Sequence, residues 1–189
     1  MGENAVENAI KLCQPLLKLG EDVIKRKSRI PANPEFGVSY MQGNLSITMM
    51  QGGIKVNIVP DECVISIARR IIPEEDIDKC EKEIMDALRS MPGVRWDSKL
   101  ILRTPPVPDT YNDSVTDELA GIIKDVTGTT GKYGHLGSLP IDPVALEWGA
   151  KIISTGLAHG LETNAHGKNE CVFLKDIEDL SEVIARFIT

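Results

Sequence analysis

The segment Gln51–Arg70, with the sequence QGGIKVNIVPDECVISIARR, guides the interpretation of the first half of this chain. It opens with a Gly-Gly pair that favours a turn, and it closes with a run in which apolar residues alternate with others. One face of this run carries Cys63, Ile65 and Ile67, and the other carries Val64, Ser66, Ala68 and Arg70. A repeat of two residues is typical of a strand that packs one face on a core and leaves the other open.

Apolar residues at helical spacing lie on both sides of this strand. Residues 3–27 repeat apolar side chains every three or four positions, and Pro15 is expected to kink the helix that they form. Residues 77–91 give the clearest amphipathic helix of the chain, and Pro73 with the acidic residues after it suits the first turn. The sequence therefore predicts one helix before the strand and one after it.

Two further strands are predicted in the same half of the chain. The first has Leu45, Ile47 and Met49 on one face, and the second covers residues 94–102. Residues 1–104 then follow the order helix, strand, strand, helix, strand. This is the order of a ferredoxin-like α+β unit that lacks its first strand, which would precede the first residue.

A stiff, proline-rich connector at residues 104–108 predicts the boundary between two domains, 1–104 and 105–189. The elements expected in the second domain are a helix from Ser114 to near Gly128, a loop or short strand at 131–138, a short helix at 142–148, a buried strand at 151–157 and a final helix capped by Asp176. About two strands make a marginal sheet. We therefore expect an α/β segment that completes a larger sheet.

The composition excludes several classes of function. The chain of 189 residues has 28 acidic and 21 basic residues, and the basic stripe that phosphate backbones require is missing, so nucleic acid is not an expected partner. Its four cysteines are scattered without a C-x-x-C pair, which suits reduced thiols. The sequence shows no signal peptide and no apolar run of about 20 residues, so we expect a cytoplasmic protein without a membrane partner.

The polar segment His166–Glu170 follows the strand predicted at residues 151–157, a position at which α/β proteins commonly bind ligands. Asn169 and Glu170 could orient the histidine ring or cap the approach to the next element. Taken alone, a histidine at this position more often belongs to an ordinary surface loop than to a ligand site. Asn57 and Arg70, which flank the central strand, have a similarly plain alternative as solvated polar groups.

Three motifs in order resemble a known family. Gly2–Ala5 resembles its G-x-N-A helix start, Gly53–Arg70 resembles its G-x-x-x-N-x-x-P strand ending in arginine, and His166–Glu170 resembles its H-x-x-N-E segment. The family is that of the dinuclear zinc hydrolases that include acetylornithine deacetylase, succinyl-diaminopimelate desuccinylase, aminoacylase and glutamate carboxypeptidase. The chain resembles the lid, or dimerisation, domain together with the C-terminal part of the catalytic domain.

The resemblance implies roles for individual residues. His166 would be one ligand of a site that holds two zinc ions in the parent enzyme, with Glu170 and Asp142 beside the ligands. Asn57 would reach the active site of the partner subunit of a homodimer, and Arg70 would bind a substrate carboxylate with its two-pronged guanidinium. In that family a metal-bound water attacks an amide. The substrate class implied is an N-acyl amino acid or a small peptide.

The sequence also departs from the family pattern. It has no H-x-D ligand pair, no histidine before Gly2, and a Glu-Glu pair only at Glu74-Glu75, where a helix begins. The segment Gly137–Asp142 is stretched, and Val144 stands where an arginine is expected. One imidazole cannot hold a catalytic zinc, which needs about three protein ligands. We therefore expect no catalytic residue in this chain, no stoichiometric zinc, and no activity from the chain alone.

Three interpretations remain open at this point. The chain is a C-terminal fragment of a metal-dependent amide hydrolase, a complete non-catalytic dimerisation or binding module, or an unrelated ferredoxin-like regulatory domain. In the last case Asn57, Arg70 and His166 match the family by coincidence. The first two predict a homodimer, because unpaired strand edges are a liability for a monomer.

Overall fold

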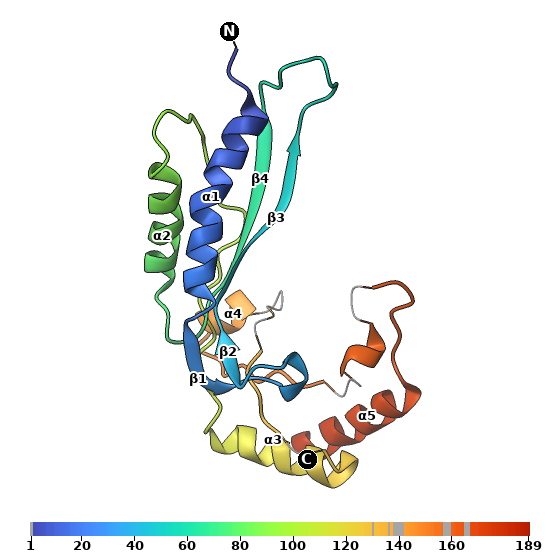
Figure 1. Ribbon diagram of the computed structural model, residues 1–189. Coiled ribbons are helices and arrows are strands. Elements are labelled where there is room, and N and C mark those ends of the chain that lie inside the picture. The colour runs from blue at the N-terminus through green and yellow to red at the C-terminus, as the bar shows by residue number, and fades with distance from the viewer. Residues whose placement is uncertain (1, 130, 136, 138–141, 157–159, 165–166) are drawn as a thin grey trace. The chain divides into compact units, whose positions relative to one another are not determined.

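The computed structural model describes residues 2–129, 131–135, 137, 142–156, 160–164 and 167–189 (Figure 1). The chain forms two compact units, each made of two stretches of sequence. Unit 1 contains Met1–Ser28 and Gln42–Pro106, and unit 2 contains Arg29–Met41 and Val107–Thr189. The chain therefore passes between the units three times.

Helix α1 (Ala5–Val23) begins unit 1. Its N-cap is Asn4, whose side-chain oxygen accepts hydrogen bonds from the backbone N–H groups of Val6 and Glu7 at 3.1 and 3.3 Å. The helix is continuous through Pro15 and ends four residues earlier than the apolar pattern predicts. Lys27 instead begins β1 (Lys27–Pro31), a short strand that the sequence did not predict, and it pairs with β2 (Tyr40–Gln42).

Strands β3 (Asn44–Gly52) and β4 (Cys63–Arg70) form an antiparallel hairpin. Opposite residues of such a pair point to the same face. The register shifts between Ile47 and Met49, so that Met49 lies opposite Ser66 and Met50 lies opposite Ile65. A bulge at this place exchanges the faces of the residues that follow. The prediction that Met49 shares the face of Leu45 was therefore wrong, because alternation alone does not reveal an extra residue.

The core of unit 1 lies on one face of this hairpin. Helix α1 packs against the hairpin and also against α2 (Ile77–Arg89), whose N-cap is Asp76 (Figure 1). The buried side chains at the centre are Leu12, Leu16, Val23, Leu45 and Leu88. Ile65 and Ile67 of β4 pack against this cluster, while Val64 and Arg70 are exposed. The predicted two faces of β4 are thus confirmed.

Residues 94–102 do not form the strand that the sequence predicts. Val94 and Trp96 pack against the core, but Leu100, Ile101 and Leu102 are 58, 86 and 70% exposed. A strand requires a neighbour for its backbone hydrogen bonds. The residues that the structure describes offer none here, and the apolar pattern could not reveal that.

Unit 2 contains α3 (Ser114–Thr127), α4 (Asp142–Glu147) and α5 (Leu174–Ile188), with short 3-10 turns η1 (Pro34–Phe36) and η2 (Gly160–Thr163). Helices α3 and α5 pack on each other. Helix α3 is capped by Asp113 and ends at Gly128, whose φ is 73°. Residue 32 makes an isolated parallel bridge to residue 134.

Two predictions in unit 2 were wrong in detail. Residues 151–156 of the expected buried strand have no regular secondary structure, and residue 157 lies outside the described residues. Helix α5 begins at Leu174, and Phe173 occupies the cap position that was predicted for Asp176. The overall class is a mixed α+β fold with small antiparallel sheets, as predicted. None of the described helices is both long enough and apolar enough to cross a membrane.

Candidate functional site

Asn57 lies in the connection between β3 and β4, and it is exposed. Gly53, with φ of 77°, begins this connection, and the N–H of Ile58 donates to the carbonyl of Lys55 at 3.1 Å. The apolar side chains beside Asn57 are also exposed, and those of Ile54, Val56, Ile58 and Val59 are 91, 106, 49 and 58% accessible. The hairpin therefore presents an amide within an apolar tip.

Arg70 lies at the opposite end of the same hairpin. It is the last residue of β4, it pairs with Asn44, and its side chain is exposed. Cys63 and Gly52 pair at the other end, next to the tip. The eight residues of β4 span about 23 Å at ~3.3 Å per residue. One hairpin therefore cannot bring Asn57 and Arg70 to the same small molecule.

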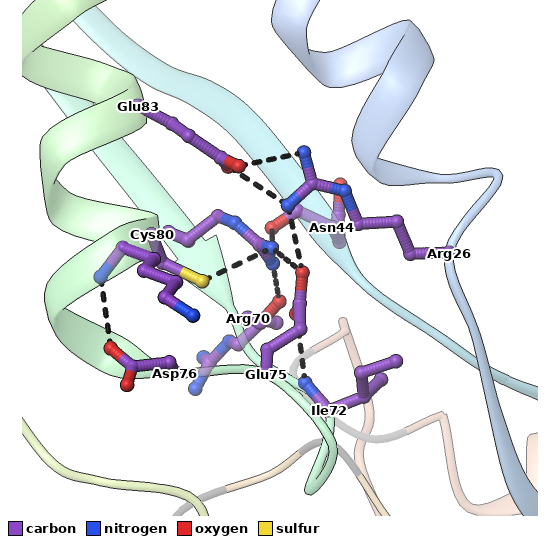
Figure 2. A network of polar contacts seen from close by, with 10 residues as sticks. Arg26, Asn44, Arg70, Ile72, Glu75, Asp76, Cys80 and Glu83 are labelled. Atoms are coloured by element: carbon purple, nitrogen blue, oxygen red, sulfur yellow. Dashed lines mark hydrogen bonds and ion pairs between the residues drawn. The ribbon is translucent and has the colours of Figure 1, made fainter.

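Charged side chains form a network next to Arg70, on the face of the hairpin that packs against the core (Figure 2). The side chain of Arg69 is only 7% exposed, and its Nη2 donates to Glu75 Oε1 at 2.5 Å. Its Nη1 donates to the backbone carbonyl of Arg70 and, at 3.4 Å, to that of Asn44. The Sγ of Cys80 lies 3.6 Å from Nη2. Arg69 thus connects the end of β4 with both neighbouring elements.

Glu75 is the centre of this network, and its side chain is 10% exposed. Besides Arg69, it accepts from Arg26 Nη1 at 3.0 Å and from the backbone N–H of Ile72 at 3.1 Å (Figure 2). Arg26 also donates to both carboxylate oxygens of Glu83, at 2.8 and 3.1 Å. These hydrogen bonds to Glu83 and Glu75 raise the pKa of Arg26, so Arg26 stays protonated and positively charged.

One feature of the sequence indicates this network. Arg69 follows Cys63, Ile65 and Ile67 at a spacing of two residues, and so it occupies the core face of β4. A buried cation requires a partner. The Glu74-Glu75 pair lies at the entrance to α2, as the sequence indicates; Glu75 supplies that partner, and Glu74 accepts from the hydroxyl of Ser28 at 2.9 Å.

The other predicted site residues lie in the second half of the chain. Asp142 is the first residue of α4 and is buried, and Glu170 is exposed. His166 lies outside the described residues. His135 is described and exposed, and its Nδ1 accepts a hydrogen bond from the N–H of Gly137 at 3.1 Å. Among the described residues, no group of three or more His, Cys, Asp or Glu side chains could hold a metal ion.

Comparison with known proteins shows similarity in both sequence and fold. Residues 1–93 match the model of the M20 peptidase dimerisation domain. The chain is 23% identical over 182 residues to a succinyl-diaminopimelate desuccinylase of Marinobacter nauticus, covering 96% of this chain and 45% of that protein. Its fold is similar to that of an M20 family metallo-carboxypeptidase from Sulfolobus solfataricus, with a TM-score of 0.58 at 18% identity over 98% of this chain and 44% of the other. The chain spans less than half the length of either protein.

Proposed function

We propose that this chain provides dimerisation and substrate recognition to a metal-dependent amide hydrolase, because residues 1–93 match the model of the M20 peptidase dimerisation domain. The observation that carries the proposal is the position of Arg70, exposed at the end of a strand within that domain. Its guanidinium suits a carboxylate, which it can bind through two parallel hydrogen bonds. The proposed substrates are N-acyl amino acids or small peptides, with N-succinyl amino acids as the first to test.

The proposed assembly is a homodimer, and the hairpin supports it. Since Asn57 lies about a strand length from Arg70, the two residues would serve different active sites. In a homodimer Arg70 would contact substrate in one site while the exposed tip would place Asn57 in the site of the partner subunit. An exposed apolar tip is also a common sign of a protein contact.

The metal centre is proposed to lie largely outside this chain. His166 would supply one ligand of a two-zinc site, and Asp142 and Glu170 would lie beside the ligands. The described residues include no cluster that fits a metal ion, so no step of the reaction is assigned to this chain's own residues. When bound, zinc would activate a water molecule for attack on the amide. We propose that the chain alone binds no stoichiometric zinc and is inactive, and that its free thiols are those of a cytoplasmic protein.

The test of carboxylate recognition is a titration of the chain with an N-succinyl amino acid, followed through the arginine side-chain NMR signals. We expect saturable shifts at Arg70, and loss of about tenfold or more in affinity in Arg70→Gln, because a charge-assisted contact disappears. Arg95→Gln is the matched control, because Arg95 is also exposed in unit 1 and, among the described residues, forms an ion pair with Glu3 alone. Equal affinities in wild type and Arg70→Gln would remove Arg70 from the site.

A non-catalytic dimerisation module is the second candidate function. The observation in its favour is that the family match covers the dimerisation domain alone and the described residues hold no metal cluster. A dimer that fails to bind any N-acyl amino acid would favour this module. Two tightly bound zinc ions per chain in elemental analysis would exclude it.

A further inference from the structure

The backbone that leaves β4 is held at several points between the strand and α2 by hydrogen bonds to side chains and to other backbone groups. Arg70 ends the strand and Ile77 begins the helix, so six residues make the connection. The carbonyl of Arg70 accepts from Arg69, and the N–H of Ile72 donates to Glu75. The N–H of Glu75 in turn donates to the carbonyl of Ile72 at 3.0 Å.

These contacts close into a ring. The guanidinium of Arg69 binds the carbonyl of Arg70 with one nitrogen and the carboxylate of Glu75 with the other. The second oxygen of Glu75 binds the N–H of Ile72. The ring therefore fixes the carbonyl of Arg70 and, two residues later, the N–H of Ile72. The ends of strands and helices commonly fray, and the ring restrains the backbone at such an end.

The burial of the Arg69–Glu75 ion pair points to a role other than stabilising the fold. Both charges are about nine-tenths buried, and the Nε of Arg69 has no hydrogen-bond partner within the described structure. Two well-packed apolar residues at such positions are often as stable as an ion pair or more so. What the ion pair adds is a defined geometry, because its hydrogen bonds hold the backbone in one arrangement.

Gly43, the residue just before β3, lies close to the Arg69 guanidinium and limits the room in which it can move. A Cβ placed on Gly43 would lie 3.1 Å from Arg69 Nη1 and 3.1 Å from Cγ1 of Val23. The absence of a side chain at Gly43 thus lets the backbone just before β3 lie close to the Arg69 guanidinium, which also contacts the carbonyl of Asn44 and the carboxylate of Glu75. Its direction toward the carbonyl of Arg70 is set by packing as well as by charge.

We infer that Arg69 and Glu75 are positioning residues for Arg70, holding in place the backbone at the end of β4 from which the Arg70 side chain reaches a carboxylate. The inference rests on the proposed role of Arg70 in substrate recognition. Its physical basis is that a guanidinium binds a carboxylate well only when its two donors are aligned with both oxygens. Positioning Arg70 in advance reduces the ordering that binding would otherwise require.

The test compares Glu75→Gln with Glu83→Gln in the full chain. Both substitutions remove a carboxylate that binds Arg26, but only Glu75 also binds Arg69 and the N–H of Ile72. Two measurements are made on each variant: the heteronuclear NOE of the Arg70 amide and Nε–Hε groups, and the Kd for succinate. In Glu75→Gln we expect the NOE of Arg70 to fall and the Kd to rise about tenfold.

In Glu83→Gln we expect both measurements to match wild type. Glu75→Gln with an unchanged NOE and unchanged Kd would overturn the inference. If wild type does not bind succinate but the NOE of Arg70 still falls in Glu75→Gln, the positioning role stands and the proposed carboxylate role fails. Should Glu75→Gln not fold, Arg69→Lys replaces it, since it keeps the charge but not the fork that binds two acceptors.

Discussion

Arg69 and Arg70 are adjacent in sequence and lie in opposite environments. Arg69 is enclosed between the strands and α2, whereas Arg70 is exposed at the end of β4. The repeat of two along the strand predicts this difference, and it correctly placed Arg70 on the open face. The partners of Arg69 could not be predicted, because Glu75 and Asn44 reach it only through the turn into α2 and the pairing of β3.

The cysteines differ in reactivity at the residue scale. Burial, as the largest cause, raises the pKa of Cys13 and of Cys80 above the usual 9.0, and Cys171 is exposed. A raised pKa means less thiolate at pH 8, and the thiolate is the reactive form. We expect Ellman's reagent at pH 8 to label Cys171 rapidly and Cys13 and Cys80 only after unfolding. Rapid labelling of all four thiols in the folded chain would contradict this expectation.

The same shifts predict the sign of a pH effect on stability. Thiols of the unfolded chain lose protons near pH 9.0, while those of the folded chain hold them to higher pH. The folded state therefore binds more protons above pH 9, and the free energy of unfolding should decrease as pH rises through the raised pKa values. Urea denaturation at pH 8 and pH 10 measures this change, and Cys80→Ala should reduce it.

The elements of unit 1 show what sequence patterns can and cannot predict. The helices and the two strands of the hairpin follow directly from apolar spacing. Strand β1, whose first two residues belong to unit 1 and the rest to unit 2, was missed because one of its inward positions is Ser28, a polar residue that is buried and hides the alternation. Residues 94–102 were predicted as a strand in error, since a pattern in one segment cannot report whether another segment pairs with it. The bulge in β3 could not be predicted for the same reason, because it depends on how β3 pairs with β4.

Packing of α1 gives a sharp comparison between two neighbouring leucines. Leu16 is fully buried in the core of unit 1, and Leu17 is 59% exposed on the other side of the helix. Leu16→Ala should lower the free energy of unfolding by about 2–5 kcal/mol, because it leaves a cavity. Leu17→Ala should change it by no more than about 0.5 kcal/mol. Urea denaturation followed by circular dichroism measures both, and equal losses would refute the assignment of the buried face.

The start of α1 allows a second comparison. Asn4 accepts two backbone hydrogen bonds at the N-cap, whereas the side chain of Asn8, one turn further on, accepts a hydrogen bond from the exposed Lys11 and none from a backbone N–H of the described residues. Asn4→Ala should reduce stability by about 1 kcal/mol, the usual effect of losing a cap. Asn8→Ala serves as the control and should leave stability nearly unchanged. A larger loss in Asn8→Ala than in Asn4→Ala would mean that the cap is not formed.

At the scale of the whole molecule, the family match predicts association. We expect light scattering at micromolar concentration to give twice the mass of one chain, because residues 1–93 match the model of a peptidase dimerisation domain. Adding EDTA should leave this mass unchanged, since no metal is proposed to hold the subunits together. A monomeric mass across the micromolar range would contradict the homodimer.

The three passages of the chain between the two units affect how the molecule responds to cutting. Residues 29–41 belong to unit 2, where Arg29 pairs with Asp109 at 3.0 Å and the carbonyl of Pro31 accepts from Gly134 at 2.7 Å. A protease cut in the proline-rich segment 104–108 would therefore give two pieces, each of which contains part of unit 2. The contacts within unit 2 would keep the two pieces associated. On a denaturing gel they would separate, but under native conditions they would elute together. Expressing either half alone would leave exposed the surface on which the other half packs.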